Sequence, residues 1–596
     1  MVSCVLIANR GEIACRIVRS VRMLGLRSVT VFTEVDAKAP HRFLADDARS
    51  LGDDPMAYLD MRAIIDAAQK SGADAIHPGY GFLSQNPDFA QACLDADLVW
   101  IGPSPDVIRV LGDKRSSRQA AERSGVPVIP GAEECNTPEE AEVLAQRIGF
   151  PLLLKAAGGG GGKGMRQVDG LADIREAFVS AEREARNAFG DGRLLLEKFI
   201  RPARHIEVQI LGDAIRSVAV GVRECSLQRR YQKVLEESPP PLLAHSILKR
   251  IAGDAERLMT AAGYSSAGTV EFLVDADGHH YFLEVNTRIQ VEHPVTELVT
   301  GVDIVAEQIR IACGGSVHDA PEPRGHAIEL RLNAEDPACN YLPCTGEVRM
   351  LRWPQVPGVR IDAGITEGSL IGSHYDPMIA KIIAWGSTRS EALQRLRQAL
   401  QELVLLGVGT NQGMLLDLIE EPWVQRGETF THTLETWSWI PPEMPEIYKT
   451  LHGSQSPSHR QGHKTHADHI VGAVRELPSK TTSVVGAVRE PPFKISSPRG
   501  IWVSDRGRVY LLPSEDDTSS RQIHRKHGVI APMTGKVVAI HVQVGDVVIE
   551  GQVVAILEAM KMEYRLTAPH QGTVSKIACI VGTLVDLGQA ILMVDP

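Results

Sequence analysis

Two periodicities of apolar and polar residues organise the first hundred residues. An apolar run at 2–8 is followed by an amphipathic stretch at 13–24 and a second apolar run at 28–32. The order strand, turn, helix, strand predicts the start of a parallel α/β layer. A further apolar run at 73–76 leads into the glycine-containing loop 77–84, and parallel sheets place ligands at such strand ends.

A run of five glycines, 158–162, lies between Lys155 and Lys163, after a predicted strand at 151–155 and before a predicted helix at 171–188. Ordering each glycine costs about 1 kcal/mol of backbone entropy, which makes the run unsuitable as structural filler. It does allow several N–H groups to face one anion, with lysine charge added. A flexible linker is the alternative, and the position of the run inside a predicted domain disfavours it.

Alternation of polar and apolar residues continues beyond the glycines. Residues 194–200 predict a strand whose backbone could line an adenine slot, and residues 204–210 predict a half-buried strand. The segment 224–233 is rich in Arg, Gln and Lys. We therefore expect a polar, strongly basic loop at 224–233.

The densest set of candidate chemical groups surrounds the turn 275–278, which two alternating strands flank. In a hairpin of this kind, Glu271, Glu284 and Asn286 project from one face. Two carboxylates and an amide oxygen form the kind of site that Mg²⁺ takes beside nucleotide phosphates. The sequence therefore predicts a divalent cation site on this hairpin.

Immediately downstream, Arg288, Gln290 and Glu292 supply a guanidinium, an amide and a carboxylate. A solvated polar turn is the alternative for these residues. The strand predicted at 325–336 carries Arg331, which either faces the same cleft or is a structural ion-pair partner, and the sequence favours neither. Helical periodicity at 390–403 closes this large domain, whose boundary lies near Pro441 and Pro442.

The C-terminal region is duplicated. Residues 531–552 recur at 568–589 with a constant offset of 37 residues, as Val/Ile-rich runs punctuated by Gly. This pattern predicts two β-meanders related by a pseudo-two-fold axis. Lys561 falls at the junction of the copies, between Met560 and Met562. An ordinary exposed lysine on a turn is the alternative, but the flanking methionines favour a recognition peptide for an enzyme that modifies the lysine.

Composition narrows the class of protein. A length of 596 residues predicts about four domains. The net charge of −11, without a long Lys/Arg block, argues against nucleic acid as a partner. Nine dispersed cysteines fit reduced intracellular thiols. No apolar run approaches the ~20 residues of a membrane span, and the first strand begins beside Met1, so we expect no leader peptide and a cytoplasmic location.

The sequence Ala-Met-Lys-Met at 559–562, inside a duplicated β-domain, resembles the biotin carboxyl carrier domain, an all-β flattened barrel of the biotinyl/lipoyl type. Residues 7–411 resemble biotin carboxylase, an ATP-grasp enzyme of α/β and α+β structure with three subdomains. The implied domains are an N-terminal α/β domain at 1–113, an ATP-grasp domain at 114–325 with a glycine-rich lid at 130–203, a C-terminal domain at 326–445, a linker at 446–527 that is partly ordered near 500–512, and a carrier domain at 528–596.

The resemblance implies a role for each candidate residue. Lys114 and Lys155 would hold the phosphates of ATP, under a lid that contains Gly161 and Gly162. The adenine would be contacted by Glu197, Lys198, Phe199 and Ile200, and the ribose region by His205. Gln228 would also bind the cofactor, and Tyr231 stands next to the nucleotide where some members carry His. Glu271, Glu284 and Asn286 would hold Mg²⁺ or Mn²⁺. Lys233, Arg288 and the backbone of Val291 would hold bicarbonate.

The reaction that the resemblance implies begins when Glu292 takes the proton of bicarbonate, whose oxygen then attacks the γ-phosphate of ATP. Carboxyphosphate forms and breaks into CO2 and phosphate, and the phosphate takes the proton of the biotin ureido nitrogen. Arg331 stabilises the resulting biotin enolate, which attacks CO2, and carboxybiotin on Lys561 is the product. A separate carboxyltransferase β subunit would pass the carboxyl group to acetyl-, propionyl- or methylcrotonyl-CoA. A biotin protein ligase would attach the biotin, and a homo-oligomer would form within a hetero-oligomeric complex.

Two other functions stay open from the sequence alone. One is a carrier and scaffold protein whose ATP-grasp half is inactive, which bicarbonate-dependent ATP hydrolysis stimulated by free biotin would exclude. The other is an ATP-grasp ligase with a different acceptor, which leaves the C-terminal domain unexplained. Related α subunits often carry a larger β-rich domain in this position, which docks the partner subunit. The segment 443–527 is too short for a full domain of that kind, so the way in which the partner docks stays open.

Overall fold

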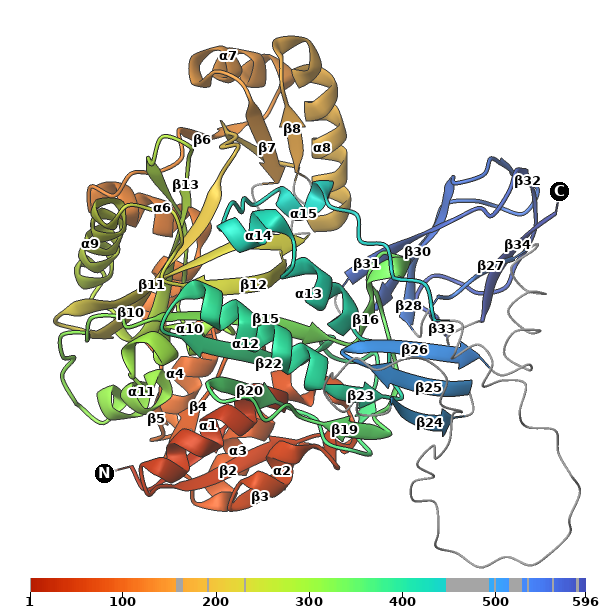
Figure 1. Ribbon diagram of the computed structural model, residues 1–596. Coiled ribbons are helices and arrows are strands. Elements are labelled where there is room, and N and C mark those ends of the chain that lie inside the picture. The colour runs from red at the N-terminus through yellow and green to blue at the C-terminus, as the bar shows by residue number, and fades with distance from the viewer. Residues whose placement is uncertain are drawn as a thin grey trace, which may run out of the picture.

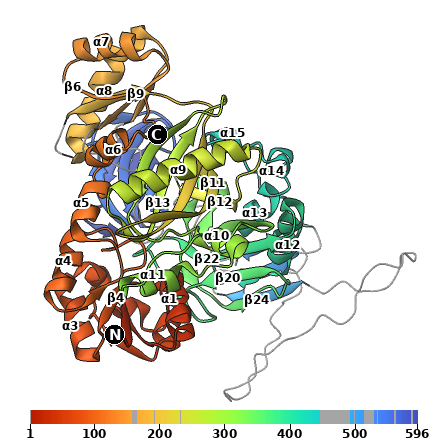
Figure 2. The same ribbon diagram turned by 90° about the vertical axis from the view of Figure 1, so that its left-hand side faces the viewer.

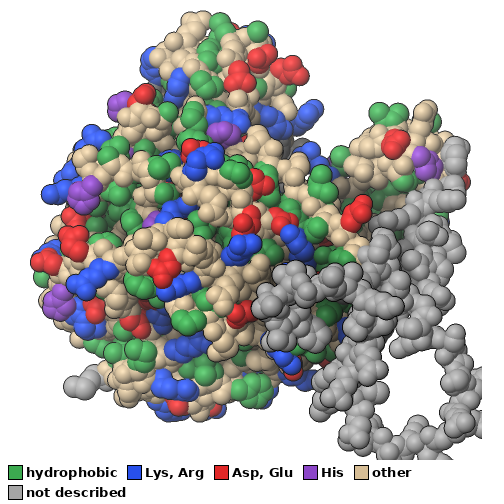
Figure 3. Space-filling model, in the orientation of Figure 1, with side chains coloured by type: hydrophobic (Ala, Val, Ile, Leu, Met, Phe, Trp, Pro, Cys, Tyr) green, Lys and Arg blue, Asp and Glu red, His purple; other side chains and the backbone are tan. Residues whose placement is uncertain are grey.

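The computed structural model describes residues 2–156, 165–189, 192–229, 232–445, 492–497, 500–513, 528–532, 535–559, 562–585 and 589–595. The N-terminal layer lies below a large central sheet, a small lid stands above it, and the C-terminal β-domain lies to one side (Figure 1). The side view places α9 across the central sheet and the lid above α6 (Figure 2). On the face shown in Figure 3, Lys and Arg side chains are interspersed with Asp and Glu. No helix in the described ranges is long and apolar enough to cross a membrane.

The N-terminal layer is a five-stranded parallel sheet in the order β3-β2-β1-β4-β5. The predicted first helix is present as α1 because Ile13, Ile17 and Val21 form one apolar stripe that packs on the sheet. Gly11, with φ of +64°, allows α1 to begin directly after β1. The elements are β1 (Cys4–Ile7), α1 (Gly11–Met23), β2 (Arg27–Phe32), α2 (Pro40–Leu44), β3 (Asp47–Ser50), α3 (Met61–Ser71), β4 (Ala75–His77), α4 (Pro87–Asp95), β5 (Val99–Trp100), α5 (Pro105–Gly112) and α6 (Lys114–Arg123).

The lid is a separate four-stranded antiparallel sheet in the order β6-β9-β7-β8. Two helices cover it, and Phe178, Leu152 and Leu194 lie in its own buried core. Its elements are β6 (Gly131–Cys135), α7 (Pro138–Ile148), β7 (Leu152–Ala156), β8 (Arg166–Val168), α8 (Ile174–Phe189) and β9 (Leu194–Lys198). The glycine run predicted to contact phosphate lies outside the described residues.

The central sheet has eight antiparallel strands in the order β14-β13-β10-β11-β12-β15-β22-β20. It therefore crosses the domain boundary predicted at 325/326, because β12 pairs directly with β15. Its strands are β10 (Arg204–Asp213), β11 (Ser217–Arg229), β12 (Gln232–Ser238), β13 (Ser265–Val274), β14 (His280–Asn286), β15 (His326–Asn333), β20 (Val359–Ala363) and β22 (Met378–Gly386).

The expectation of a basic loop at 224–233 is wrong. Residues 224–229 belong to β11 and residues 232–233 to β12, and Gln228 pairs with Lys233 across these strands. Polar residues occupy these strands because their side chains find charged partners inside the protein, whereas the sequence pattern suggested solvation. The two strands thereby carry basic side chains into the interior.

Helices cover the central sheet, and smaller strands extend its C-terminal side. Leu396 and Leu400 of α12 pack with Ile382 of β22 in the largest apolar core. The remaining elements of this region are α9 (His245–Ala261), α10 (His293–Thr300), α11 (Ile304–Ala312), β16 (Glu335–Asp336), β17 (Leu342–Pro343), β18 (Gly346–Glu347), β19 (Met350–Arg352), β21 (Leu370–Ile371), α12 (Arg389–Glu402), β23 (Val404–Leu406), α13 (Gln412–Leu418), α14 (Pro422–Arg426) and α15 (Thr433–Thr436).

The region predicted as a linker contains a three-stranded antiparallel sheet. Its strands are β24 (Phe493–Ser497), β25 (Gly500–Asp505) and β26 (Arg508–Pro513). Order near 500–512 was expected, whereas β24 was not. Residues 446–491, 498–499 and 514–527 lie outside the described residues.

The C-terminal domain consists of two four-stranded sheets, β27-β34-β32-β29 and β31-β30-β28-β33. Each sheet takes two strands from each copy of the duplication, so the copies interlock and neither copy forms the β-meander that the sequence predicted. Val537, Leu557, Val574 and Val594 from both copies share one buried core. The strands are β27 (Gly528–Ile530), β28 (Gly535–Ile540), β29 (Val547–Val548), β30 (Val553–Ala559), β31 (Met562–Thr567), β32 (Gly572–Ile577), β33 (Leu584–Val585) and β34 (Ala590–Asp595).

Candidate functional site

A cluster of charged side chains lies on one face of the central sheet. Strand register brings it together, because Glu207 of β10 pairs with Glu271 of β13, which pairs with Glu284 of β14. Residues directly opposite in neighbouring strands point to the same face. His205, two residues before Glu207, shares this face. The strands therefore place one histidine and three carboxylates side by side.

Lys233 of β12 is the central cation of this cluster. Its Nζ contacts Glu207 and lies 2.6 Å from Glu292 Oε1 and 3.2 Å from Glu271 Oε1. Burial alone would lower the pKa of Lys233, but the three carboxylates raise it well above its ordinary value. Burial would raise the pKa of Glu207, but Lys233, His205 and Arg223 together lower it to about 2. Lys233 is the strongest of the cations that keep these three buried carboxylates ionised.

The residues predicted to bind a divalent cation are adjacent. Asn286 Nδ2 donates to Glu271 Oε1 at 2.7 Å, and Glu284 lies opposite Glu271 in the hairpin. Burial and the nearby Glu271 charge raise the pKa of Glu284, with Lys114 acting in the opposite direction. Two carboxylates that repel one another in this way suit a divalent cation, which would remove the repulsion. The donor set therefore fits Mg²⁺ or Mn²⁺.

His205 lies inside the carboxylate cluster. Its Nε2 is 2.9 Å from Glu271 Oε2 and 3.3 Å from Glu207 Oε1. Burial lowers the pKa of His205, but Glu271 and Glu207 outweigh it and raise the pKa to about 9. The imidazole is therefore protonated at neutral pH in this arrangement. Its predicted contact with the ribose region stays a prediction.

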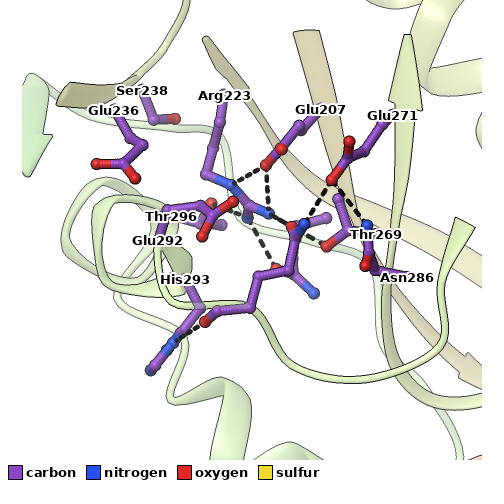
Figure 4. Close-up of polar contacts among 12 residues, drawn as sticks. Glu207, Arg223, Glu236, Ser238, Thr269, Glu271, Asn286, Glu292, His293 and Thr296 are labelled. Carbon is purple, nitrogen blue, oxygen red and sulfur yellow. Dashed lines mark hydrogen bonds and ion pairs between the residues drawn. The ribbon is translucent and has the colours of Figure 1, made fainter. Parts of the chain in front are cut away.

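Arg223 of β11 lies against the cluster in the protein interior, and its side chain is 0% exposed to solvent. Its Nη2 donates to Glu207 Oε2 at 3.2 Å and to Gln290 Oε1 at 2.7 Å, and Gln290 in turn donates to Glu271 Oε1 at 2.7 Å. The close-up shows the guanidinium pointing toward Glu207, with Thr269 and Glu271 beyond it (Figure 4). A buried guanidinium with this many acceptors fixes the loop that carries Gln290 against the strands.

Glu292 joins the two sides of the site. Its Oε1 accepts from Lys233, and its Oε2 accepts from Arg331 Nη2 at 3.0 Å. Arg331 Nε also donates to Glu236 Oε1 at 2.5 Å, so this arginine both faces the cleft and forms a structural ion pair. Burial raises the pKa of Glu292, but Lys233, Arg331 and Arg223 together outweigh it, and the net shift is downward. Glu292 is therefore a carboxylate at neutral pH.

Arg288 and Val291 border the same cluster. Arg288 Nε donates to Gln85 Oε1 at 2.7 Å, and its Nη2 donates to Asn286 Oδ1 at 3.0 Å. The carbonyl of Val291 accepts from Lys381 Nζ at 2.8 Å. These contacts hold the 287–292 loop between the hairpin and the N-terminal layer.

The predicted adenine segment lies in the lid. Lys155 forms an ion pair with Glu197, and Lys198 Nζ donates to the carbonyls of Gly149 and Phe150 at 3.1 and 2.5 Å. The Phe199 N–H donates to the Pro151 carbonyl, and Phe199 and Ile200 follow the end of β9. Lys155 and Glu197 thus neutralise one another.

Four predicted site residues, Gly161, Gly162, Tyr231 and Lys561, lie outside the described residues. Gln228 is buried beside Lys233 in the β11–β12 pair. The sequence did not point to Glu207 or Arg223 as site residues, and it pointed to Gln290 only as an amide beside Arg288 and Glu292, without a role. Glu207 could have been found, since it follows His205 by two positions on an alternating strand and must share its face. Arg223 carried no such signal because its partners come from four different segments.

Family models match most of the chain in four consecutive pieces. They are the biotin carboxylase N-terminal domain at residues 1–108, the carbamoyl-phosphate synthase L chain ATP-binding domain at 113–319, the biotin carboxylase C-terminal domain at 329–436, and a biotin-requiring enzyme domain at 527–594.

The most similar relatives include two α subunits aligned over nearly their full length. The biotin-dependent acyl-coenzyme A carboxylase α3 subunit of Mycobacterium leprae is 42% identical over 590 residues, which cover 98% of this chain and 97% of that protein. The mitochondrial propionyl-CoA carboxylase α chain of Homo sapiens is 38% identical over 670 residues, covering 99% and 91%. Biotin carboxylase from Campylobacter jejuni has a TM-score of 0.70 and 40% identity, covering 73% of this chain and 99% of that chain.

Fold, site and matched models together define an ATP-dependent biotin carboxylase joined to a biotin carrier domain. The chain belongs to the family of biotin-dependent acyl-CoA carboxylase α subunits. It is a ligase that carboxylates biotin at the expense of ATP, with biotin and ATP as cofactors. Subunits of this family work with carboxyltransferase partners. The resemblance drawn from the sequence is confirmed.

Proposed function

We propose that bicarbonate and biotin react at the cluster formed by Lys233, Arg288, Glu292 and Arg331, and that Lys561 carries the biotin. The observation that carries this proposal is the pairing of Glu292 with two different cations, Lys233 at 2.6 Å and Arg331 at 3.0 Å. A carboxylate held between two cations on separate strands marks a place where a second anion can enter. Bicarbonate is such an anion.

Glu292 is the general base in this proposal. Bicarbonate would compete with Glu292 for Lys233, and loss of this contact raises the basicity of the carboxylate. Glu292 can then accept the bicarbonate proton, so that the deprotonated oxygen attacks the γ-phosphate of ATP. Lys233 and Arg288 would hold the anion, and Arg331 would stabilise negative charge on the ureido oxygen of biotin.

Nucleotide binding is assigned to residues on both sides of the cleft. Lys114 and Lys155 would contact the phosphates, because the contact of Lys155 with Glu197 can exchange for one with phosphate. Glu271, Glu284 and Asn286 would hold the divalent cation, whose charge neutralises the phosphates. A biotin carboxylase domain from Hydrogenobacter thermophilus, 41% identical with a TM-score of 0.69, was solved with MgADP and bicarbonate, which supports this assignment.

The acceptor of the carboxyl group lies on another chain in this proposal. A carboxyltransferase β subunit would transfer it to a short acyl-CoA, since similar proteins are named for acyl-, propionyl- and methylcrotonoyl-CoA. A biotin protein ligase would modify Lys561. The nine cysteines are free, which fits a reducing compartment such as the cytoplasm. We also propose a homo-oligomer within the hetero-oligomeric complex.

Replacement of Lys561 tests the carrier assignment. Coexpression with an active biotin ligase should add one biotin to the wild-type chain and none to Lys561→Ala, as measured by intact mass and avidin blot. Lys576→Ala, an exposed lysine in the second copy of the duplication, should be modified like the wild type. Lys561→Ala should keep bicarbonate-dependent ATP hydrolysis with free biotin, because its carboxylase half is unchanged.

The assay of ATP hydrolysis with free biotin distinguishes the proposed function from its rivals. A scaffold with an inactive ATP-grasp half would show no ATP hydrolysis stimulated by free biotin in either protein. A correctly folded wild-type chain without added mass at residue 561 would exclude the carrier assignment. Glu292→Gln should lower the rate with free biotin by about 10²–10⁴-fold, the usual contribution of a general base.

A further inference from the structure

The three-stranded sheet β24–β26 has one apolar face that packs on the carboxylase body. Strand register aligns Ile495, Trp502 and Leu511 across the three strands, so that they point to one side. Trp502, which is 6% exposed, packs with Val404 and Leu406 of β23. The apolar residues Met350, Phe493, Ile495, Val509 and Leu511 complete this contact. The sheet therefore shares an apolar core with the C-terminal domain of the carboxylase.

Polar and steric contacts fix the β25–β26 turn to the same domain. Arg508 makes a two-pronged ion pair with Asp417 of α13, at 2.6 and 3.1 Å. Asp417 also accepts from the indole N–H of Trp439 at 2.8 Å. At Gly507, with φ of +78°, an added Cβ would lie 2.5 Å from the carbonyl oxygen of Leu400. Such a close backbone approach requires glycine and indicates a specific contact.

The opposite face of the sheet is also in contact with the body. Val503 and Leu512 pack with Met444, at the end of the described carboxylase region. Both faces of this small sheet are thus held by residues that precede the 446–491 segment. Residues 514–527 alone then connect this sheet to the carrier domain.

We infer that the β24–β26 sheet, residues 493–513, is an anchor that shortens the tether of the biotin carrier domain. The inference rests on the proposed function, in which Lys561 carries biotin. The effective tether is residues 514–527, 14 residues instead of the 82 of 446–527. Whatever its conformation, a 14-residue connection spans at most about 50 Å.

A short tether raises the concentration of the carrier at the carboxylase site. Effective concentration falls roughly as the −3/2 power of tether length, so a change from 14 to 82 residues lowers it about tenfold. The carrier lies within reach of the body, because Leu342 of β17 packs against the carrier core. The anchor thus favours carboxylation of the tethered biotin, which takes place within one chain, over its reaction at the partner subunit.

Competition between tethered and free biotin measures the effective concentration directly. Holoprotein is given limiting ATP and labelled bicarbonate, and free biotin is added until labelling of the carrier is halved. The double variant Gly507→Val/Arg508→Glu and, separately, Trp502→Ser should lower that concentration of free biotin about tenfold, with unchanged turnover of free biotin alone. Arg506→Glu is the control, since it makes the same charge change in the same turn at a residue with no ion pair among the described residues.

Hydrogen exchange of residues 493–513 provides the second measurement. Both anchor variants should lose protection there, and the control should not. The inference would be overturned if variants that have lost hydrogen-exchange protection at 493–513 needed the same concentration of free biotin as the wild type to halve carrier labelling. It would also be overturned if both variants kept that protection. Absence of label on the wild-type carrier would instead refute the proposed role of Lys561, so the two failures are distinguishable.

Discussion

At the scale of single residues, Lys233 is the cation that three carboxylates of the site share. Its ammonium contacts Glu207 and Glu292 and lies 3.2 Å from Glu271. Burial of these carboxylates opposes their ionisation, and Lys233 is the first group that counteracts it in each. The same charge that would attract bicarbonate therefore also holds Glu292 in the form that can accept a proton.

Lys233→Gln should move the acid limb of the pH profile to higher pH. The pKa of Glu292 is lowered in the folded protein, so its base form is present above that pKa and is lost as the pH falls through it. Removal of the ammonium raises this pKa, and the rate with saturating free biotin should decline at a higher pH than in the wild type. The maximal rate should fall by about 10²–10³-fold, as when one preorganised charge partner is removed.

Steady-state rates between pH 5 and 9 test this, with Lys249→Gln as the control. Lys249 is exposed on α9, outside the site. An acid limb that coincides with the wild type, in a variant that folds and binds ATP, would contradict the role of Lys233 in ionising Glu292.

The sequence identifies those site residues that lie close together along the chain. Glu271, Glu284 and Asn286 fall on one hairpin, so alternation alone places them on one face. Arg223 could not be found in this way, because its acceptors come from β10, β13, the 287–292 loop and α10. Likewise, only the structure shows that Arg331 contacts both Glu236 and Glu292.

At the scale of elements, local pattern predicts strands well and their pairing less well. The 37-residue repeat predicts the strands of the carrier domain, but not that each sheet combines both copies. Residues 224–233 are mistaken for a loop because buried basic strands are rare and solvated basic loops are common. Strand β24 was missed because its alternation spans only five residues in a Pro- and Ser-rich region.

Interlocking of the two copies makes folding of the carrier domain all-or-none. A fragment of residues 528–559 contains one copy, and it should be unfolded because β28 and β30 would lose β31 and β33. Residues 528–596 should fold, since both sheets are then complete and enclose Val537, Leu557 and Val574. Circular dichroism and amide-proton dispersion check this. A folded, monomeric 528–559 fragment would show that the copies are independent.

At the scale of the whole molecule, the central sheet joins two regions that the sequence predicts to be separate domains, the ATP-grasp domain and the C-terminal domain of the carboxylase. Strand β15, predicted to begin a new domain, pairs with β12 of the ATP-grasp region. Arg331 of β15 thereby reaches Glu292. The two halves of the cleft are parts of one eight-stranded sheet, which explains how the bicarbonate and biotin sides of the proposed site stay in register.

The β24–β26 sheet extends the carboxylase body in the same way, and truncation should reveal this. A chain ending at residue 445 leaves Val404 and Leu406 of β23 without the cover of Trp502, at a cost of about 1.5–3 kcal/mol for each side chain fully exposed. A chain ending at residue 513 restores this cover. Residues 1–513 should therefore melt a few degrees above residues 1–445 and bind less of an apolar dye. The variant Arg508→Glu in the 1–513 chain should have a melting temperature between those of the two chains. Identical melting temperatures of 1–445 and 1–513 would mean that the sheet does not stabilise the carboxylase body.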